Sequence, residues 1–98
     1  MTNNRSRTEI VSQILDAAND HDDVGGITPT TLMYEVMLSG AKLNEYLIVL
    51  TSHGLLSYER TMHRYSISGK GLRFLEIYDN LDHMMKGEEE EEERRQQI

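Results

Sequence analysis

The sequence predicts a mainly α-helical fold with one small β-hairpin, an α+β arrangement that ends in a long C-terminal helix. Three observations predict it. Apolar residues recur at helical spacing in three successive stretches before residue 54. Residues 55–59 and 64–67 then alternate between apolar and polar side chains, as paired strands do. A last helical pattern begins after residue 68. This order of elements is that of a winged helix-turn-helix.

The first helix is expected from about Ser6 or Thr8 to Asn19. Its apolar residues have the spacing of one helix face. They are Ile10, Val11, Ile14, Leu15 and Ala18. Residues 19–26 are rich in Asn, Asp and Gly, which favour turns, so the helix is expected to end there.

Two short helices joined by a tight turn are expected next. Thr28 can cap the first of them, and Pro29 suits its first position. Ser39 can cap the second after a turn at residues 38–40. Gly54 is expected to end that helix in the left-handed conformation. The residues expected to face the core are Leu32, Met33, Val36, Leu43, Tyr46, Leu47 and Leu50.

The two alternating stretches predict a hairpin. Residues 60–63 have a suitable length for its loop, although they contain no Asn-Gly pair. Ile27 is a lone apolar residue that can add a very short strand. Ser68 is expected to cap the last helix, which begins beside two glycines, Gly69 and Gly71.

The last helix is more apolar than a domain of this size needs. Several of its apolar residues follow a 3-4-3 spacing that resembles a short coiled-coil seam, and we expect a homodimer through them. The predicted dimerisation residues are Phe74, Ile77, Tyr78, Leu81, Met84 and Met85. Gly87 is expected to interrupt the helix. Residues 88–93 are six consecutive glutamates, which are typical of a solvated, disordered tail.

The resulting organisation has four parts. These are a flexible N-terminus (1–7), a winged-helix domain (8–71), a dimerisation helix (72–86) and an acidic tail (87–98). The chain of 98 residues contains no cysteine, so no disulfide or thiolate metal site is expected. No apolar run approaches the roughly 20 residues of a membrane span. Without a hydrophobic signal segment, a cytoplasmic protein is the expectation.

The charge distribution points to one region. The formal net charge is −7, which disfavours a general nucleic-acid binder. Residues 39–73 nevertheless carry five cations against Glu45 and Glu59, a net charge of +3. The cations are Lys42, Arg60, Arg64, Lys70 and Arg73. A local basic face can bind phosphates in an acidic protein, although the surrounding field weakens the attraction.

The third helix and the hairpin loop are the candidate DNA contacts. With the leucines inward, Asn44 and Glu45 face outward, where they can pair with adenine and cytosine, and Lys42 can contact phosphate. The loop offers phosphate or minor-groove contacts. The candidate residues are Ser39, Gly40, Ala41, Lys42, Asn44, Glu45, Ile48, Arg60, Thr61, His63 and Arg64. The alternative is an ordinary solvated face that serves protein contacts.

No motif for catalysis, a cofactor or a metal is complete. Residues 64–71 lack the first glycine of a phosphate loop. Val24 and Thr31 stand where a calcium loop starting at Asp20 needs oxygen ligands. The four histidines lack zinc spacing. We therefore expect a protein that is not an enzyme and has no cofactor.

A larger pattern resembles the small archaeal winged-helix proteins of the ArnR-like group. It comprises Leu38-Ser39, Leu43, Tyr46-Leu47, residues 53–56 (HGLL), 65–71 (YSISGKG) and 74–78 (FLEIY). The resemblance covers about residues 8–85. It implies a winged-helix fold, an archaeal source, transcriptional or chromatin-type DNA binding, and dimers through the C-terminal helix, often as an antiparallel coiled coil. It also implies that Lys70 helps to start the last helix and approaches phosphate. Ser68 departs from the usual Thr of the group.

These observations predict a dimeric winged-helix DNA-binding transcriptional regulator. Its partner would be double-stranded DNA, and the acidic balance favours sequence-selective rather than architectural binding. The alternative function is a protein–protein interaction module without direct DNA binding, which would use Ile48, the last helix and the acidic tail. The tail could also compete with DNA for the basic face.

Overall fold

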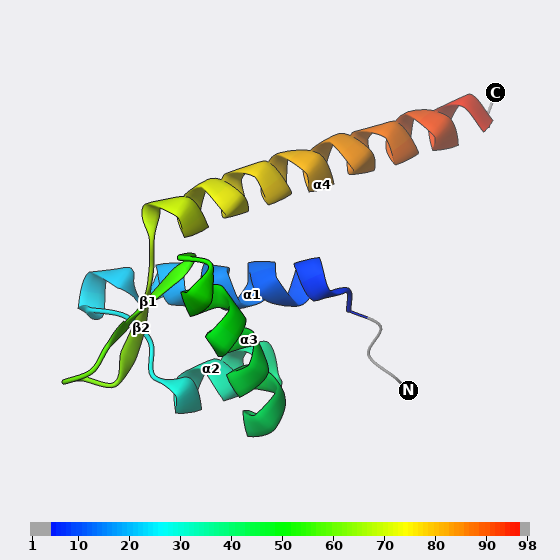
Figure 1. Ribbon diagram of the computed structural model, residues 1–98. Helices are drawn as coiled ribbons and strands as arrows, with labels where there is room; N and C mark the ends of the chain where they lie inside the picture. Colours follow the sequence, from blue (N-terminus) through cyan, green and yellow to red (C-terminus); the bar gives the residue numbers. More distant parts are fainter. Residues whose placement is uncertain (1–4, 97–98) are drawn as a thin grey trace.

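Four α-helices and one antiparallel hairpin make up the domain (Figure 1). The computed structural model describes the backbone of residues 5–96 and the side chains of residues 5–85. The elements are α1 (Arg7–Asp20), the short 3-10 helix η1 (Asp22–Val24), α2 (Pro29–Val36), α3 (Gly40–Ser52), β1 (Leu56–Glu59), β2 (Arg64–Ile67) and α4 (Gly69–Gln96). This order confirms the predicted fold class, a winged helix-turn-helix with a long C-terminal helix.

Side-chain caps fix where the helices begin. The predicted caps are confirmed: the hydroxyl oxygens of Thr28, Ser39 and Ser68 accept hydrogen bonds from backbone amides at 3.3, 3.2 and 3.0 Å. Ser6 caps α1 in the same way. Each bond satisfies one of the amides that a helix N-terminus leaves without a partner. Gly54 has the predicted left-handed conformation, with φ of 72°.

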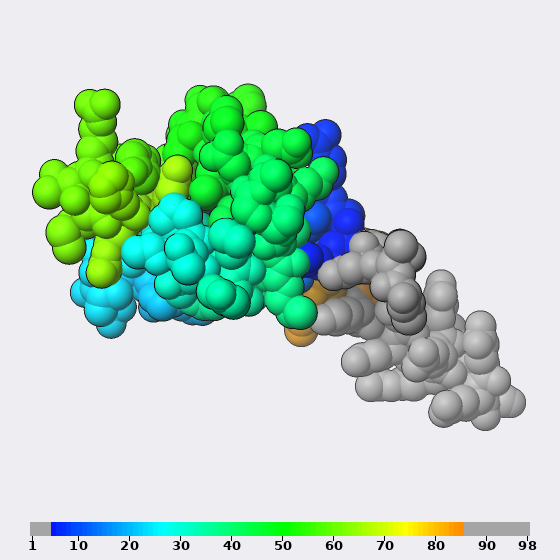
Figure 2. Space-filling model, turned by 90° about the horizontal axis from the view of Figure 1, so that it is seen from below, coloured from blue at the N-terminus to red at the C-terminus, as the bar shows by residue number. Residues whose placement is uncertain are grey.

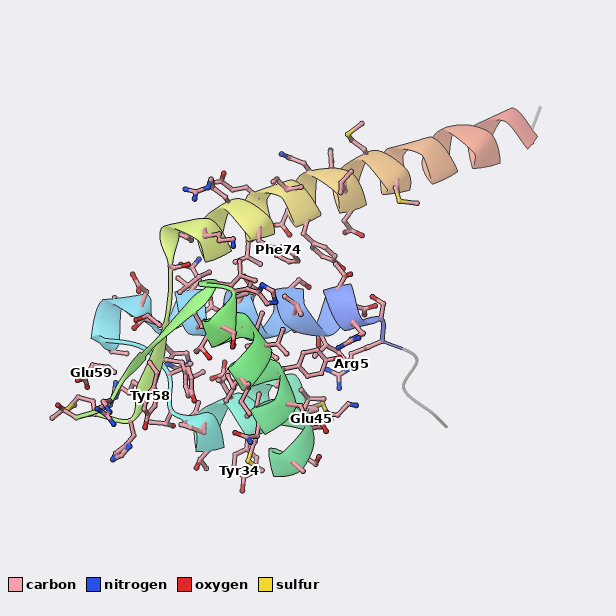
Figure 3. All side chains as sticks on the ribbon, in the orientation of Figure 1. Arg5, Tyr34, Glu45, Tyr58, Glu59 and Phe74 are labelled. Carbon is pink, nitrogen blue, oxygen red and sulfur yellow. The ribbon has the colours of Figure 1, made fainter. Side chains whose placement is uncertain are left out.

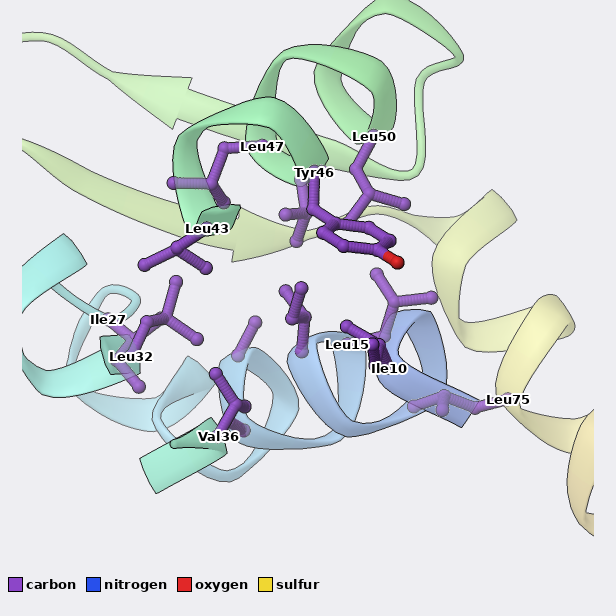
Figure 4. Packing of buried hydrophobic residues seen from close by; sticks show 14 residues of the cluster. Ile10, Leu15, Ile27, Leu32, Val36, Leu43, Tyr46, Leu47, Leu50 and Leu75 are labelled. Atoms are coloured by element: carbon purple, nitrogen blue, oxygen red, sulfur yellow. The ribbon is translucent and has the colours of Figure 1, made fainter. Parts of the chain in front are cut away.

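The core lies where α1, α2 and α3 meet (Figure 4). Its fully buried large side chains come from these helices and from Ile27. They are Ile14, Leu15, Ile27, Leu32, Leu43 and Leu50. Because α2 is only eight residues long, too short to be stable alone, this burial is what holds the helix-turn-helix together.

The hairpin joins the body through an isolated β-bridge at Ile27. β1 and β2 pair in antiparallel register from Leu56 with Ile67 to Glu59 with Arg64. Ile27 forms an isolated bridge with Tyr65, in which each amide donates to the other's carbonyl, at 2.9 and 2.8 Å. At the place of the expected short strand, Ile27 forms one isolated bridge rather than a strand, and this bridge anchors the hairpin to the loop before α2.

The start of α4 packs closely on the hairpin and α1 (Figure 1). A Cβ atom at Gly71 would collide with the Leu55 carbonyl oxygen and would lie 2.7 Å from Ile67 Cγ1, so only glycine allows this approach. Leu75 enters the core and Phe74 packs against it. The predicted interruption at Gly87 is not present, because the helical backbone continues to Gln96.

The N-terminal segment is attached to the body earlier than the sequence predicts. A flexible segment was expected through residue 7, but the Arg5 guanidinium donates to the carbonyl oxygens of Val36 (2.6 Å) and Met37 (3.2 Å). It also donates to Gln13 Oε1 at 2.6 Å. Arg5 therefore caps the C-terminal end of α2; residues 1–4 lie outside the described structure. Within the described chain, no helix has the length and apolarity needed to cross a membrane.

Candidate nucleic-acid interface

α3 presents a polar face to solvent. Leu43, Tyr46, Leu47 and Leu50 are buried on one side of the helix, which leaves the predicted contact residues on the other. Ser39, Gly40, Ala41, Lys42, Asn44, Glu45 and Ile48 are all exposed. The small residues at the start of α3 leave its first turn open to a close approach. Sequence periodicity was sufficient to find this face because the helix is regular and packs with one side.

Lys42, the cation on this face, is paired with a carboxylate. Lys42 Nζ lies 3.6 Å from Glu45 Oε2, and both side chains are more than half exposed. An exposed pair of this kind contributes little to stability. It does offset the positive charge at the start of α3, so base and phosphate contacts by Lys42 would compete with Glu45.

The hairpin loop, which we call the wing (residues 60–63), is held in a defined shape. The Glu59 carboxylate accepts hydrogen bonds from the Thr61 amide at 3.1 Å and from the Met62 amide, and these bonds, Met62 first, lower the pKa of Glu59. His63 adopts a positive φ of 53°, and its Nδ1 lies 2.7 Å from the Tyr58 hydroxyl. The loop thus holds Arg60, Thr61 and His63 exposed at its tip.

Two predicted phosphate contacts, Arg64 and Lys70, already have partners in the body. Arg64 is half-buried and donates through Nη1 to the carbonyl oxygen of Val24 at 2.8 Å. Lys70 Nζ donates to the His53 carbonyl oxygen at 2.7 Å, which caps the end of α3. Among the described residues, no hydrogen bond or ion pair involves Arg60. Arg60 is therefore the wing cation whose donors are open to a ligand.

α2, α3 and the hairpin form one side of the molecule, away from α4. Figure 2, seen from that side, shows their surfaces side by side. Figure 3 places Tyr34 at the edge of this side, with Glu45 on α3 above it. Tyr34 is 79% exposed and is absent from the contacts expected from the sequence. The inward spacing of Leu32 and Val36 was the signal that could have identified it, because Tyr34 falls on the opposite side of α2.

The predicted dimerisation residues divide into two groups. Ile77, Leu81, Met84 and Met85 are exposed. Phe74 and Tyr78 are half-buried and stack on each other, with ring centroids 6.4 Å apart and planes 8° from parallel. Phe74 points from α4 toward α1 (Figure 3) and packs against the domain's own core. The exposed apolar row is thus shorter than the predicted seam and lies farther along α4.

Acidic side chains line the cleft between α1 and α4. The cleft includes Glu9, Asp16, Tyr78, Asp79 and Asp82. Partial burial, followed by the negative charges of Asp20 and Asp79, raises the pKa of Asp16. Among the described residues, no group of three or more His, Cys, Asp or Glu side chains has a geometry that could hold a metal ion.

Comparison with known families agrees with this architecture. The profile of the winged helix-turn-helix family matches residues 4–86, a range that includes every described element except the end of α4. No curated protein sequence matches the chain. The match covers both the helix-turn-helix and the exposed apolar row of α4.

Proposed function

Because the chain belongs to the winged helix-turn-helix family, a fold that serves DNA binding, we propose that it is a transcriptional regulator that binds double-stranded DNA as a homodimer. The observation that carries the proposal is the exposed polar face of α3, which lies on the same side of the molecule as the wing and away from α4. This arrangement lets a recognition helix enter the major groove while the wing reaches the flanking backbone.

The residues of α3 suit base reading better than charge neutralisation. The Asn44 side-chain amide can donate to and accept from adenine, and the Glu45 carboxylate can accept from the cytosine amino group. Lys42 and Arg60 supply phosphate contacts. Lys42 and Arg60 are few cations for one protomer, so strong binding would come from two copies acting together. Each neutralised phosphate would contribute about −0.9 to the slope of log K against log salt concentration.

The homodimer is supported by the exposed apolar row of α4. Leu81, Met84 and Met85 are each more than half exposed, and such a contiguous apolar row in a small domain is typical of an interaction surface. Following the sequence resemblance, we propose an archaeal ArnR-like protein that acts in the cytoplasm, without a catalytic activity or cofactor.

The test is selection of bound genomic fragments by the purified protein at two salt concentrations. We expect a small set of enriched sequences that persists at the higher concentration. Asn44→Ala should reduce the enrichment of the preferred site over random duplex by about tenfold, because a lost bidentate base contact weakens discrimination by roughly 1–3 kcal/mol. If no duplex is retained at low salt, direct DNA binding is wrong.

Matched arginine variants separate phosphate contact from general charge. Arg60→Ala should weaken all sequences alike and reduce the salt slope by about one. Arg73→Ala removes the same charge from an exposed position on α4 and should change DNA affinity far less. Equal losses for the two variants would mean that the wing makes no specific phosphate contact.

A protein–protein interaction module is the second candidate. Tyr34 on α2, Met37 in the turn after it and Ile48 on α3 are 79%, 80% and 57% exposed. Large apolar side chains such as these favour a protein partner over phosphates. Removing residues 88–98 tests the competing role of the acidic tail. Tighter DNA binding by the shortened protein would support competition, and unchanged binding would exclude it.

A further inference from the structure

An open groove lies between the first half of α1 and the outer flank of α3. Its volume is about 610 Å³, and it is lined by Arg7, Val11, Lys42, Glu45, Tyr46 and Val49. Sites for small molecules in proteins have volumes of this size and combine apolar walls with a few polar groups. Here the apolar part comes from the two valines and the Tyr46 ring, and the polar groups are two cations, one carboxylate and one hydroxyl.

Within the described part of the chain, the Tyr46 hydroxyl has no hydrogen-bond partner. The residue is 8% exposed, yet no hydrogen bond to another described residue involves its oxygen. No fully enclosed side-chain nitrogen or oxygen of the described residues lacks a partner, so the Tyr46 oxygen must reach solvent, and Tyr46 is one of the residues that line the groove. Figure 4 shows the Tyr46 ring extending from α3 toward α1, with the oxygen at its outer end. A nearly buried phenol without a protein partner favours a hydrogen bond to a ligand in the groove that it lines.

The charges in the groove favour an anion. Arg7 is the first residue of α1, where the positive end of the helix dipole disfavours a cation. No carboxylate of the described residues forms an ion pair with Arg7. Lys42 lies 3.6 Å from Glu45, which leaves the lining with a net charge of +1. An acid group placed between the two cations would supply the partner that Arg7 lacks.

We propose that this groove binds a small organic acid with an apolar body, such as an aromatic or medium-chain carboxylate. The carboxylate pairs with Arg7 and Lys42, the Tyr46 hydroxyl donates a hydrogen bond to it, and the apolar body covers Val11 and Val49. Lys42 and Glu45 also belong to the α3 face proposed to contact DNA. Bound acid therefore neutralises Lys42 and adds negative charge beside α3, which weakens DNA binding; this second consequence rests on the proposed function.

The first test measures binding without DNA. Three probes, 2-naphthoate, 4-phenylbutyrate and octanoate, are titrated while the methyl resonances of Val11 and Val49 are followed by NMR, with 2-naphthamide as a neutral control. We expect saturable shifts for at least one acid, with Kd on the order of 1 mM or tighter, and at least tenfold weaker binding of the amide. If none of the acids saturates by about 10 mM, or if the amide binds equally well, the proposal is wrong.

Three variants test the contacts. Arg7→Gln should weaken acid binding about tenfold, and Tyr46→Phe, which preserves the ring, should weaken it about fivefold. Arg60→Gln removes the same charge from the wing and should leave it unchanged. Circular dichroism and unfolding curves check that each variant is folded. If Arg7→Gln and Tyr46→Phe both bind as the unaltered protein does, the assigned contacts are wrong.

The last measurement connects the groove to DNA. The tightest-binding acid is added to the complex of the protein with its selected duplex. We expect release of DNA from the unaltered protein and no release from Arg7→Gln. Equal release from both would overturn the coupling. If the protein retains no duplex at all, the proposed function fails, whereas the titration still decides whether the groove is a binding site.

Discussion

The two parts of α4 have different surroundings although they form one continuous helix. In residues 69–78, which we call the packed part, Leu75 is buried and Gly71 closely approaches the hairpin. In residues 79–85, the projecting part, Leu81, Met84 and Met85 are 57%, 64% and 63% exposed. Burial of such a side chain contributes about 1.5–3 kcal/mol. The domain's core is therefore complete by about Tyr78, and the large apolar side chains beyond it are mostly exposed.

The sharpest way to break the packed part is Gly71→Ala. A methyl group there meets a backbone carbonyl, which cannot move aside without shifting the strand connection, so we expect a loss of about 3 kcal/mol in the free energy of unfolding. Denaturant unfolding measures it. Gly69→Ala is the matched control, because its Cβ would find only Arg73 Nη1 at 3.7 Å, and it should be neutral or slightly stabilising. Equal losses for the two variants would contradict the close packing of α4.

Phe74→Ala tests where the packed part ends. Phe74 is half-buried against the core, so its truncation should lower the free energy of unfolding by about 1–3 kcal/mol, less than for a fully buried Phe. The dimerisation constant, measured by sedimentation under conditions where the variant is folded, should stay unchanged. If the variant has normal stability but no longer self-associates, Phe74 belongs to the dimer interface rather than to the core.

Leu81→Lys tests the projecting part. A charge in the middle of the exposed row should weaken self-association by at least about tenfold, since an apolar contact is lost and two like charges approach each other. Sedimentation equilibrium measures the dissociation constant. Asn80→Lys adds the same charge at an exposed position beside the row and should have a much smaller effect. If the unaltered protein is a monomer at tens of micromolar, the dimer proposal is wrong.

Asp16 on α1 lines the same cleft as Asp79, the first residue of the projecting part. Asp16→Asn therefore tests the boundary between the two parts of α4, and its expected effect is the smallest. The pKa of Asp16 is raised by partial burial and then by Asp20 and Asp79, so the folded state holds the proton to higher pH than the unfolded state. Stability is therefore lost as pH rises from the ordinary carboxyl pKa through the raised one. Asp16→Asn should be slightly more stable than the unaltered protein at neutral pH, and this difference should vanish at low pH.

Unfolding curves from about pH 2 to pH 7 measure the difference. Asp22→Asn, which removes the same charge from exposed η1, is the control and should not reproduce the pH-dependent gain. Glu59→Gln should give the opposite sign, because backbone amides lower the pKa of Glu59: its stabilising contribution is present at neutral pH and is lost as pH falls through the lowered pKa.

Local chemistry made most of the fold predictable. The hydroxyl caps, the left-handed Gly54 and the two hairpin strands depend on residues close in sequence or on simple alternation. Glycine and consecutive glutamates favour a helix end at residue 87, but the backbone remains helical there.

The contacts of the cations could not be predicted in the same way. Arg5, Arg64 and Lys70 each donate to carbonyl oxygens 17 or more residues away in the chain. Which carbonyl faces a long side chain depends on how the helices pack, and periodicity carries no information about that. A count of cations in the sequence therefore overestimated the charge open to DNA, whereas the outward face of α3 followed from helix geometry alone.

The junction between α3 and α4 is held together by several close contacts. Ser68 Oγ lies 2.6 Å from the Gly54 carbonyl oxygen and Lys70 Nζ lies 2.7 Å from that of His53, while Gly71 rests against Leu55. These contacts tie the start of α4 directly to the end of α3. In a dimer formed through α4, the angle at which the two α4 helices cross would therefore determine the relative orientation of the two α3 helices. The crossing angle would thus set the distance between the two DNA half-sites.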